Sequence, residues 1–544
     1  MTYNPPVQDM LFILHDVLKF EHADVDAATM EAVLEEAAKL ASEVLAPLNV
    51  AGDEQGAVLK DGHVTTSPGF KEAYKQYCDG GWNAVPFPAE FGGQGLPWAL
   101  AFPVQEMWQG ANMAFGLCPL LNQGAVEAII SHGSKEQQEF YLPKLISGEW
   151  TGTMNLTEPH AGSDIGLVKS KAEKQGDGSY KISGQKIFIT YGEHDYTDNI
   201  IHLVLARTTD APPDVKGISL FIVPKFLEDG TRNEAVCIGL EHKLGIHGSP
   251  TCTMEFAGAK GFLIGKENEG LKYMFTMMNN ARLSVGLQGV AIAERAYQHA
   301  RNFAAERVQG KSFTTGQRVP IAEHADVKRM LMTMKSQIEA ARALTYSAAL
   351  AMDKEQQADV EVLTPIVKSW ATDLAVEVAS IGIQVFGGMG FIEETGAAQY
   401  YRDARILPIY EGTNGIQAAD LAFRKVLRDG GEAAKNYMCA AKGDISDEAL
   451  KDIYPYLGQL AETTEKLVAA GKDNKLDVVA GVSVPYLKAF AICACAVMMA
   501  RSKAAAQGKG EEFYKDKIET ADFYIANILP HAQAWLKIVQ NNLA

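Results

Sequence analysis

One carboxylate stands in an uncharged stretch late in the chain, Ile409-Tyr-Glu-Gly-Thr-Asn-Gly-Ile-Gln417. Glu411 lies between Tyr410 and Gly412, and helical patterns flank the stretch on both sides. A carboxylate that loses water in such surroundings has a raised pKa and can act as a base toward a weakly acidic C–H bond. The alternative is that Glu411 caps a helix beginning near Asn414. The spacing alone fits both interpretations.

A second segment combines hydroxyl groups, glycines and two acids: Thr151-Gly-Thr-Met-Asn-Leu-Thr-Glu-Pro-His-Ala-Gly-Ser-Asp164. Glycines let a backbone approach a flat or phosphorylated ligand closely, and Ser and Thr supply hydrogen-bond donors. The same residues also fit a capped turn at Thr157 or Ser163. The residue types alone favour neither interpretation.

Two further features have an ordinary structural explanation. Gly387 and Gly388 follow the helical pattern that begins at Thr364, where paired glycines form a normal helix end and also leave bare backbone for a ligand. Arg282 falls on a long predicted helix, where an arginine is usually a solvated surface charge.

Several chemistries and locations are disfavoured. The sequence holds no Walker A loop, no G-x-G-x-x-G after a strand, no G-x-S-x-G elbow and no H-E-x-x-H, and no metal site is expected. The formal charge of −17 argues against nucleic acid as a partner. The N-terminus lacks a basic and an apolar region, so no signal peptide is predicted. The most apolar run, Ala489 to Ala500, is too short to span a bilayer. The seven cysteines are scattered and odd in number, which favours small buried side chains in a reducing cytoplasm.

The periodicity of the 544 residues places these features on an α+β chain. Apolar residues recur at helical spacing up to residue 150, and short β-rich runs follow with no long helix between them, which favours an antiparallel barrel or sandwich. Helical patterns return at 283–307, 330–352 and 364–386, and the Gly- and Ala-rich stretch 428–443 suggests a boundary before a last helical part. The expected regions are an N-terminal extension (1–36), a helical domain (37–150), a β domain (151–265), a helical bundle (266–428) and an extra helical domain (440–544).

In this order, the segments resemble the acyl-CoA dehydrogenase family from about Pro86 to Leu421. The segments that carry the resemblance are Gly92-Gly-Gln-Gly95, Leu156-Thr-Glu-Pro-His-Ala-Gly-Ser-Asp164, Gly184-Gln-Lys-Ile-Phe-Ile-Thr190, Gly245-Ile-His-Gly-Ser-Pro-Thr251, the Arg282 helix, Glu306-Arg307, Gln384-Val-Phe-Gly-Gly388 and Ile409-Tyr-Glu-Gly-Thr413. The two additions at the chain ends resemble the extended bacterial branch that includes 3-methylmercaptopropionyl-CoA dehydrogenases.

The resemblance implies α,β-dehydrogenation of an acyl-CoA thioester on FAD, with Glu411 as the base that removes the α-proton. It implies that the Glu411 backbone N–H and a flavin ribityl hydroxyl stabilise the developing enolate. It implies an electron-transfer flavoprotein as the electron acceptor, a homodimer and a cytoplasmic location. The acyl group expected is 3-methylmercaptopropionyl or a fatty acyl chain.

The resemblance also assigns binding residues. The FAD-binding residues that it implies are Met154, Asn155, Leu156, Thr157, Ser163, Phe188, Ile189, Thr190, Arg307, Gln384, Val385, Phe386, Gly387, Gly388 and Thr413. Of these, Arg307 and the 384–388 segment would reach FAD across a subunit interface. The substrate-binding residues that it implies are Ser163, Asn279, Arg282 and Gly412.

The chain departs from the family pattern at three positions. The family often has Asp at Asn279, Gly at His160 and Arg at Ala418, so the CoA contact at position 279 is in doubt. Other functions compatible with the resemblance are an acyl-CoA oxidase, a DNA-associated flavin-bearing relative and a non-catalytic assembly factor. The charge of −17 disfavours the DNA-associated alternative.

Overall fold

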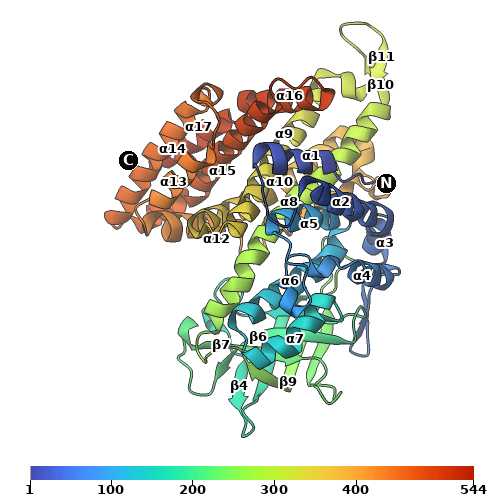
Figure 1. The fold of residues 1–544 in the computed structure, drawn as a ribbon, viewed down its shortest axis with the longest axis vertical. Helices are drawn as coiled ribbons and strands as arrows, with labels where there is room; N and C mark the ends of the chain where they lie inside the picture. Colours follow the sequence, from blue (N-terminus) through green and yellow to red (C-terminus); the bar gives the residue numbers. More distant parts are fainter. Residues whose placement is uncertain (1, 544) are drawn as a thin grey trace.

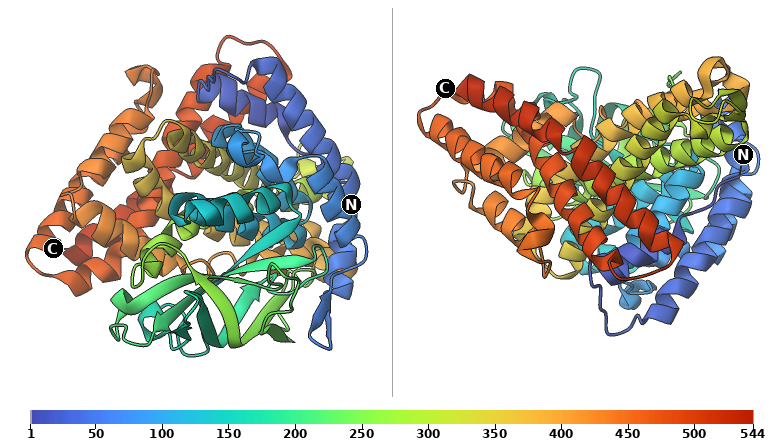
Figure 2. Two further views of the ribbon diagram at one scale, coloured as in Figure 1. Left: turned by 60° about the horizontal axis from the view of Figure 1, so that its bottom comes forward. Right: turned by 90° about the horizontal axis from the view of Figure 1, so that it is seen from above.

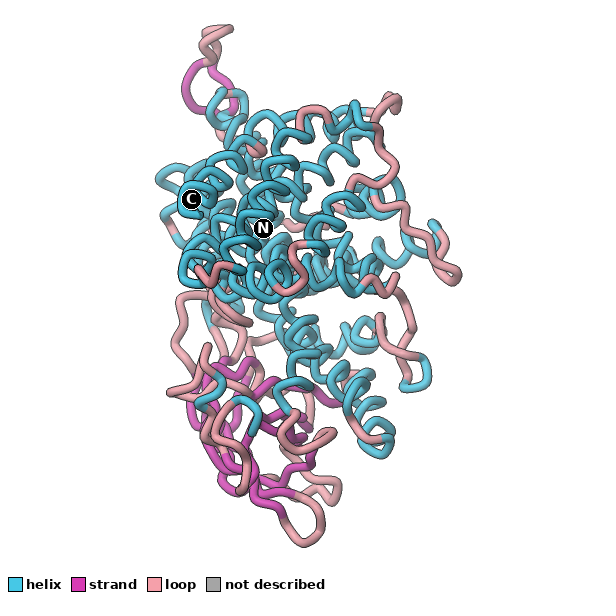
Figure 3. Tube along the Cα trace, turned by 90° about the vertical axis from the view of Figure 1, so that its left-hand side faces the viewer, coloured by secondary structure: helices cyan, strands magenta, loops and turns pink. Residues whose placement is uncertain are grey.

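The seven-stranded sheet lies at one end of the molecule and most of the helices lie toward the other end in the computed structural model, which describes residues 2–543 (Figures 1 and 3). A β domain follows the N-terminal helices, and a long helical bundle follows the β domain. The C-terminal helices pack along one flank of this bundle (Figure 2). The predicted α+β fold with an additional helical domain is confirmed.

Apolar residues at helical spacing form the N-terminal helices. The Asp26 carboxylate caps α2 by accepting a hydrogen bond from the Thr29 N–H at 2.8 Å. The helices are α1 (Val7–Phe12), α2 (Ala27–Lys39), α3 (Leu48–Gln55), α4 (Phe70–Asp79), α5 (Trp98–Ala111), α6 (Met113–His132) and α7 (Lys135–Ser147). A small hairpin of β1 (Val58–Lys60) and β2 (His63–Thr65) interrupts this helical region.

The β domain closes into a ring because β6 pairs with both β4 and β7. Its strands are β3 (Trp150–Asn155), β4 (Lys171–Lys174), β5 (Tyr180–Thr190), β6 (Asn199–Thr208), β7 (Ile218–Pro224), β8 (Ala235–Leu240) and β9 (Thr251–Leu263). The predicted antiparallel pairing is correct for most strands, but β6 runs parallel to β3 and β4. A parallel pair needs a crossover connection: the chain between β3 and β6 includes β4 and β5, and β5 lies between β4 and β6 in the sequence.

Three long helices form the centre of the bundle: α8 (Gly270–Glu306), α9 (Ala325–Asp353) and α10 (Gln357–Phe386). They cover the three predicted helical stretches except for Arg307, and each begins earlier than predicted; α10 also accommodates Pro365. The short helices α11 (Ala397–Ala404) and α12 (Asn414–Ala419) follow. An unpredicted hairpin of β10 (Val308–Lys311) and β11 (Arg318–Pro320) projects from the end of the molecule (Figure 1).

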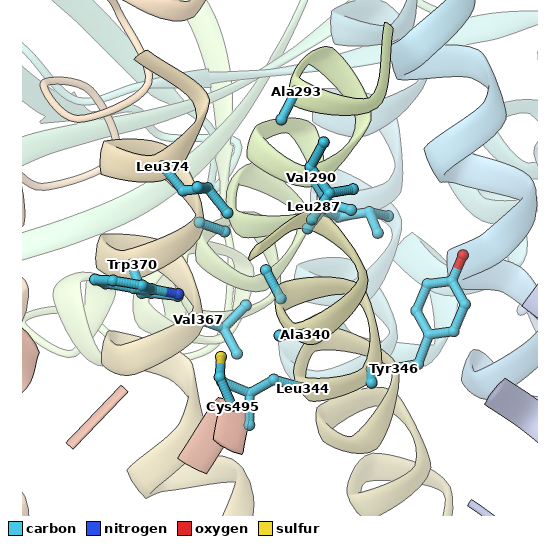
Figure 4. Close-up of a cluster of buried hydrophobic side chains, with 14 of the residues drawn as sticks. Leu287, Val290, Ala293, Ala340, Leu344, Tyr346, Val367, Trp370, Leu374 and Cys495 are labelled. Atoms are coloured by element: carbon cyan, nitrogen blue, oxygen red, sulfur yellow. The ribbon is translucent and has the colours of Figure 1, made fainter. Parts of the chain in front are cut away.

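The last domain consists of α13 (Glu432–Ala441), α14 (Tyr454–Lys472), α15 (Leu476–Ala506), α16 (Glu512–Asn527) and α17 (Pro530–Leu543). The stretch predicted as a boundary is mostly α13, because Gly430 and Gly431, both at positive φ, stand before the helix rather than inside it. Cys495 of α15 lies in the same buried cluster as Val367, Trp370 and Leu344 of the bundle (Figure 4). The domain therefore shares a core with α9 and α10.

The apolar run at 489–500 is buried as predicted, but it belongs to the 31-residue α15, so its length does not exclude a membrane span. The helices α6 and α15 and the stretch Gln357–Phe391 are long and apolar enough to cross a bilayer. Within the protein, 89% of the most apolar window of α6 and 67% of that of α15 are buried. Cysteines follow the prediction only partly, since five are buried, Cys78 is half-buried and Cys439 is exposed.

A buried group of charges joins both chain ends to the bundle. Arg342 of α9 contacts Asp9 of α1 at 2.6 Å, Glu106 of α5 at 2.7 Å and Glu294 of α8 at 2.8 Å. Lys517 of α16 also contacts Asp9, and it lies 3.0 Å from Glu339. Asp9 of the N-terminal segment therefore pairs with a cation of the bundle, Arg342, and with a cation of the last domain, Lys517.

Candidate active site

Glu411 lies in the link between α11 and α12. The predicted capping role is wrong: Thr413 is the N-cap of α12, and its Oγ1 accepts a hydrogen bond from the Ile416 N–H at 3.3 Å. Glu411 itself has a φ of 55°, a left-handed conformation that is uncommon for a residue with a side chain. Burial raises the pKa of its carboxyl, and the cations Arg282 and Lys368 oppose that shift. This carboxylate has the environment of a base rather than of a helix cap.

Arg282 of α8 is buried, so its interpretation as a solvated surface charge is wrong. Its guanidinium lies 3.9 Å from the Asp420 carboxylate, and it donates a 3.4 Å hydrogen bond to Oδ1 of the exposed Asn279. A Cβ at Gly412 would lie 3.6 Å from the same guanidinium, so Arg282 and the residue after Glu411 are neighbours. The buried Nε of Arg282 has no partner among the described residues. A buried donor of this kind fits an anionic or carbonyl group of a ligand.

Lys368 of α10 is a member of this site that the sequence analysis missed. Its side chain is fully buried, and its ammonium donates to the Gly412 carbonyl at 2.8 Å and to Asn414 Oδ1 at 2.9 Å. A lysine within an apolar helical pattern was the available signal, because a buried lysine requires specific partners.

A buried pair organises the loop 156–170. The Glu158 carboxylate accepts from Lys186 Nζ at 2.9 Å and from the backbone N–H groups of Lys169 and Ser170. A 3₁₀ turn (Ile165–Leu167) does begin directly after Ser163-Asp164, but its N-cap Asp164 makes no side-chain capping hydrogen bond, and the Glu158 side chain organises the loop instead. The carbonyl of Thr157 accepts from the Ile187 N–H at 2.9 Å, which brings this loop to strand β5 beside Phe188.

Phe188 presents its ring to solvent from a distorted part of β5. Its φ is 60°, the register between β5 and β9 shifts between Lys186 and Ile189, and 58% of the residue is exposed. Thr190 is half-buried at the end of the same strand. An exposed aromatic ring near a hydroxyl group suits a flat aromatic ligand, so these residues fit the isoalloxazine of FAD.

The other predicted residues of this segment differ in accessibility. Met154 and Thr157 are half-buried, Ser163 is exposed, and Leu156 and Ile189 are buried. Asn155 is also buried, and its Oδ1 has no partner among the described residues. The accessible members are thus Met154 near the end of β3 and Thr157 and Ser163 in the loop that follows it.

Arg307 and the segment Gln384–Gly388 form a separate group. Arg307 directly follows α8, about 38 Å along the helix axis from Arg282 at 1.5 Å per residue. The 384–388 segment ends α10, about 24 Å from Lys368 by the same measure. Phe303 and Phe386 stack with ring centroids 4.1 Å apart, so these two helix ends meet. Gly387 does end α10, as the helix-end interpretation predicts, and Gln384, Gly387 and Gly388 are exposed while Val385 and Phe386 are buried.

A chain of hydrogen bonds leads from the neighbour of Glu411 into the interior. The Tyr410 hydroxyl donates to Gln288, and Gln288 Nε2 donates to Gln109 Oε1 at 3.0 Å. Gln109 forms part of the wall of a small cavity between α5 and α6. Side chains that line this cavity include Tyr77, Trp82, Trp108, Gln105, Gln109 and Gln123. No motif in the sequence indicates this wall, because its residues are distant from one another in the chain.

Four family models match the chain in order. Their descriptions are acyl-CoA dehydrogenase, N-terminal domain (residues 28–149), middle domain (153–259) and C-terminal domain (268–425), followed by acetyl-CoA dehydrogenase C-terminal like (434–543). The chain is 46% identical to 3-methylmercaptopropionyl-CoA dehydrogenase of Ruegeria pomeroyi over 98% of this chain and 97% of that protein. It is 36% identical to a butyryl-CoA dehydrogenase of Syntrophomonas wolfei over 94% and 91%.

Solved structures show the same arrangement. Butyryl-CoA dehydrogenase of Megasphaera elsdenii is 29% identical, with a TM-score of 0.64 over 74% of this chain and 99% of that one. An acyl-CoA dehydrogenase of Bacillus anthracis, solved with FAD, is 21% identical, with a TM-score of 0.78 over 98% and 92%. This second likeness extends the shared fold to the last helical domain.

Proposed function

The chain belongs to the acyl-CoA dehydrogenase family, and we propose that Glu411 is the base with which it removes the α-proton of an acyl-CoA thioester. The protein is a flavin-dependent oxidoreductase, and the expectation that it is an acyl-CoA dehydrogenase is confirmed by its relatives. The observation that supports the base most directly is the juxtaposition of Glu411, Gly412 and the buried Arg282. A carboxylate with a raised pKa lies there beside a cation with an unpaired donor.

The residues around Glu411 have distinct proposed roles. The Glu411 carboxylate accepts the α-proton, and its backbone N–H stabilises the negative charge that develops on the thioester oxygen. Arg282 binds the CoA portion, with Ser163, Asn279 and Gly412 as further substrate contacts. Of these four residues, only Arg282 is both buried and left with an unpaired donor. Because the protein is acidic overall, a polyanionic ligand requires such a local cation.

FAD is the proposed cofactor and, when bound, supplies the acceptor for the hydride that leaves the β-carbon. The residues proposed to hold it within one chain are Met154–Thr157, Ser163, Phe188–Thr190 and Thr413. The exposed ring of Phe188 supports this assignment, as does the link from the Thr157 carbonyl to β5.

Arg307 and Gln384–Gly388 are proposed to contact FAD of a second subunit. The lengths of α8 and α10 hold these residues about 24 to 38 Å from Arg282 and Lys368 along the two helices, so one chain does not bring them to its own Glu411. A homodimer with cofactor sites completed by the partner satisfies this geometry.

A short acyl group is the proposed substrate, and 3-methylmercaptopropionyl-CoA is the first candidate. Similar proteins are named for 3-methylmercaptopropionyl-CoA and butyryl-CoA. Hydrogen bonds connect Tyr410 through Gln288 to Gln109, and Gln109 lines a small cavity together with Trp82 and Trp108. We propose that this wall receives the end of the acyl group, where a polarisable thioether or a short alkyl chain suits aromatic neighbours.

The electron acceptor, the cellular location and the absence of other partners are also proposals. An electron-transfer flavoprotein is proposed as the acceptor in preference to oxygen, and the enzyme is placed in the cytoplasm without nucleic acid or a membrane span. The unpaired cysteines support a reducing compartment, and the charge of −17 opposes binding to nucleic acid.

The test is anaerobic reduction of the purified flavoprotein by a panel of acyl-CoA thioesters. The panel includes 3-methylmercaptopropionyl-CoA, butyryl-CoA and octanoyl-CoA. Wild-type flavin is expected to bleach with the two short substrates, while Glu411→Gln keeps flavin and binds acyl-CoA without bleaching. Rapid bleaching of the Gln variant contradicts the assignment of the base, and reoxidation by oxygen as fast as by electron-transfer flavoprotein supports an oxidase instead.

A further inference from the structure

Lys368 is held in one position by two oxygen atoms of the segment that carries Glu411. Its ammonium lies 2.8 Å from the Gly412 carbonyl and 2.9 Å from Asn414 Oδ1, and no part of the side chain reaches solvent. Asn414 in turn donates to Asp373 at 2.7 Å and to the Ser369 carbonyl at 3.1 Å. The Glu411–Asn414 segment is therefore tied to one turn of α10, with Lys368 as its charged contact.

The backbone of this segment needs such a contact. Glu411 and Gly412 are consecutive left-handed residues, with φ values of 55° and 84°. A glutamate in this conformation persists only where its surroundings hold it. The Gly412 carbonyl accepts from Lys368, and the Glu411 carbonyl accepts from Gln417 at 3.3 Å. Of these two contacts, only Lys368 is short and charge-assisted.

Lys368 also belongs to the charges that face the base. Two cations face the Glu411 carboxylate, Lys368 of α10 and Arg282 of α8, and the Tyr410 hydroxyl lies nearby. Lys368 faces Asp373 from its own helix, and Arg282 faces Asp420 and Arg424 from the segment after α12. Burial is the main reason that the pKa of Lys368 is lowered to about 7; Arg282 adds to the decrease, and Glu411 and Asp373 oppose it. The ammonium form is the one that complements an ionised Glu411.

We propose that Lys368 is a positioning residue for the Glu411 base: it holds the left-handed turn through the Gly412 carbonyl and places a cation beside the carboxylate. The inference rests on Glu411 acting as the base, which is the proposed function. It adds a residue on another helix, 43 positions earlier in the sequence, whose loss disturbs both the placement and the ionisation of that carboxylate.

Three substitutions separate the two effects. Lys368→Met removes the donor and the charge, Lys368→Gln keeps an N–H donor without the charge, and Lys368→Arg keeps both. Lys488→Met is the matched control, because Lys488 pairs with the same Asp373 at 3.4 Å but is partly exposed and makes no contact with Gly412. Each variant is purified as the flavoprotein, and its flavin content and thermal unfolding are compared with those of the wild type.

The expected result for Lys368→Met is a decrease in kcat of about 10- to 100-fold, because a displaced catalytic group loses rate by such factors. KM changes little, and the acid limb of the kcat profile moves to higher pH because a cation beside the carboxylate is gone. Lys368→Gln recovers part of kcat but keeps the shifted limb, whereas Lys368→Arg returns the limb toward that of the wild type. Lys488→Met behaves as the wild type.

Two outcomes would overturn the inference. Wild-type kcat and an unmoved acid limb in Lys368→Met rule out a positioning role. A uniform loss of flavin and stability in all three variants, with no movement of the limb, assigns Lys368 to the fold alone. If Lys368→Met does not fold, the Gln and Arg pair still decides between charge and donor. Activity in the parallel Glu411→Gln enzyme would instead overturn the proposed function.

Discussion

The ring of Phe303 stacks on that of Phe386 with centroids 4.1 Å apart and planes 15° from parallel. This contact joins the end of α8 to the end of α10, and it brings Arg307 and the 384–388 segment together at a distance from Glu411. The chain thus carries two groups of predicted cofactor residues that its own helices keep apart.

A dimer in which each site uses both groups predicts complementation between two inactive variants. Glu411→Gln lacks the base, and Arg307→Ala lacks the contact proposed to cross the interface. A mixed dimer contains one site with both lesions and one intact site. We expect differently tagged, co-expressed variants to recover up to about half of the wild-type activity in doubly purified heterodimers, by this site count and because an intact interface completes one site.

Mixing the two purified homodimers without exchange serves as the control and should stay inactive. Absence of activity in verified heterodimers would show that Arg307 serves the site of its own chain.

The ionisation of Glu411 predicts a particular pH dependence. Burial raises the pKa of this carboxyl, and only the ionised form accepts a proton, so kcat/KM rises with pH through the raised pKa. The acid limb should lie above the value of about 4.3 for an exposed glutamate. Asp420→Asn should move the limb to lower pH, because Asp420 partly offsets the Arg282 cation that favours the carboxylate.

The measurement is kcat/KM for one short acyl-CoA from pH 5 to 9 at constant ionic strength. A limb at the position of an exposed carboxylate, or an upward movement in Asp420→Asn, would contradict this electrostatic account.

The buried contact of Asp9 with Arg342 predicts a large effect on stability. Burial opposes ionisation of Asp9, but Lys517 and Arg342 together lower its pKa, so its contribution is present at neutral pH and is lost as the pH falls through that lowered pKa. Asp9→Ala should reduce the free energy of unfolding by about 3–5 kcal/mol, because it leaves two buried cations with less compensation.

Asp16→Ala is the matched control, since Asp16 pairs with Lys509 of the last domain across a partly exposed contact of 2.7 Å. Its cost should be below about 1 kcal/mol. Denaturant unfolding at pH 7 measures both variants, and equal costs would show that the buried network adds nothing beyond a surface pair.

The polar wall beyond Tyr410 predicts the acyl preference. Gln109 donates to the Gly116 carbonyl at 3.0 Å and accepts from Gln288, and both glutamines are buried. Gln109→Ala removes this wall, so kcat/KM for octanoyl-CoA should increase relative to butyryl-CoA by about 10-fold, the scale of a few methylenes in an apolar pocket.

Gln94→Ala, at an exposed loop position, controls for nonspecific effects. An unchanged ratio of the two substrates in Gln109→Ala would place the acyl end elsewhere in the protein.

Local pattern was sufficient for the long helices and the β-rich runs of this protein and for its family. The helical repeats of α8, α9 and α10, the β-rich runs and the ordered motifs around Glu411 are contiguous in sequence, and each depends on neighbours within a few residues. Pattern failed where long-range pairing decides the result, because β6 pairs in parallel with β3 and β4, from which the intervening strands separate it in the sequence.

Only the tertiary structure decided the surroundings of the candidate base. Arg282 follows a pattern that suits a surface residue, yet packing of α8 against the segment after α11 buries it beside Gly412. Lys368 meets the Gly412 carbonyl because α10 crosses that segment, and no spacing rule connects two residues so distant in the chain. Desolvation and charge pairing depend on which atoms lie within a few ångströms, so the chemistry of Glu411 is set by the fold that surrounds it.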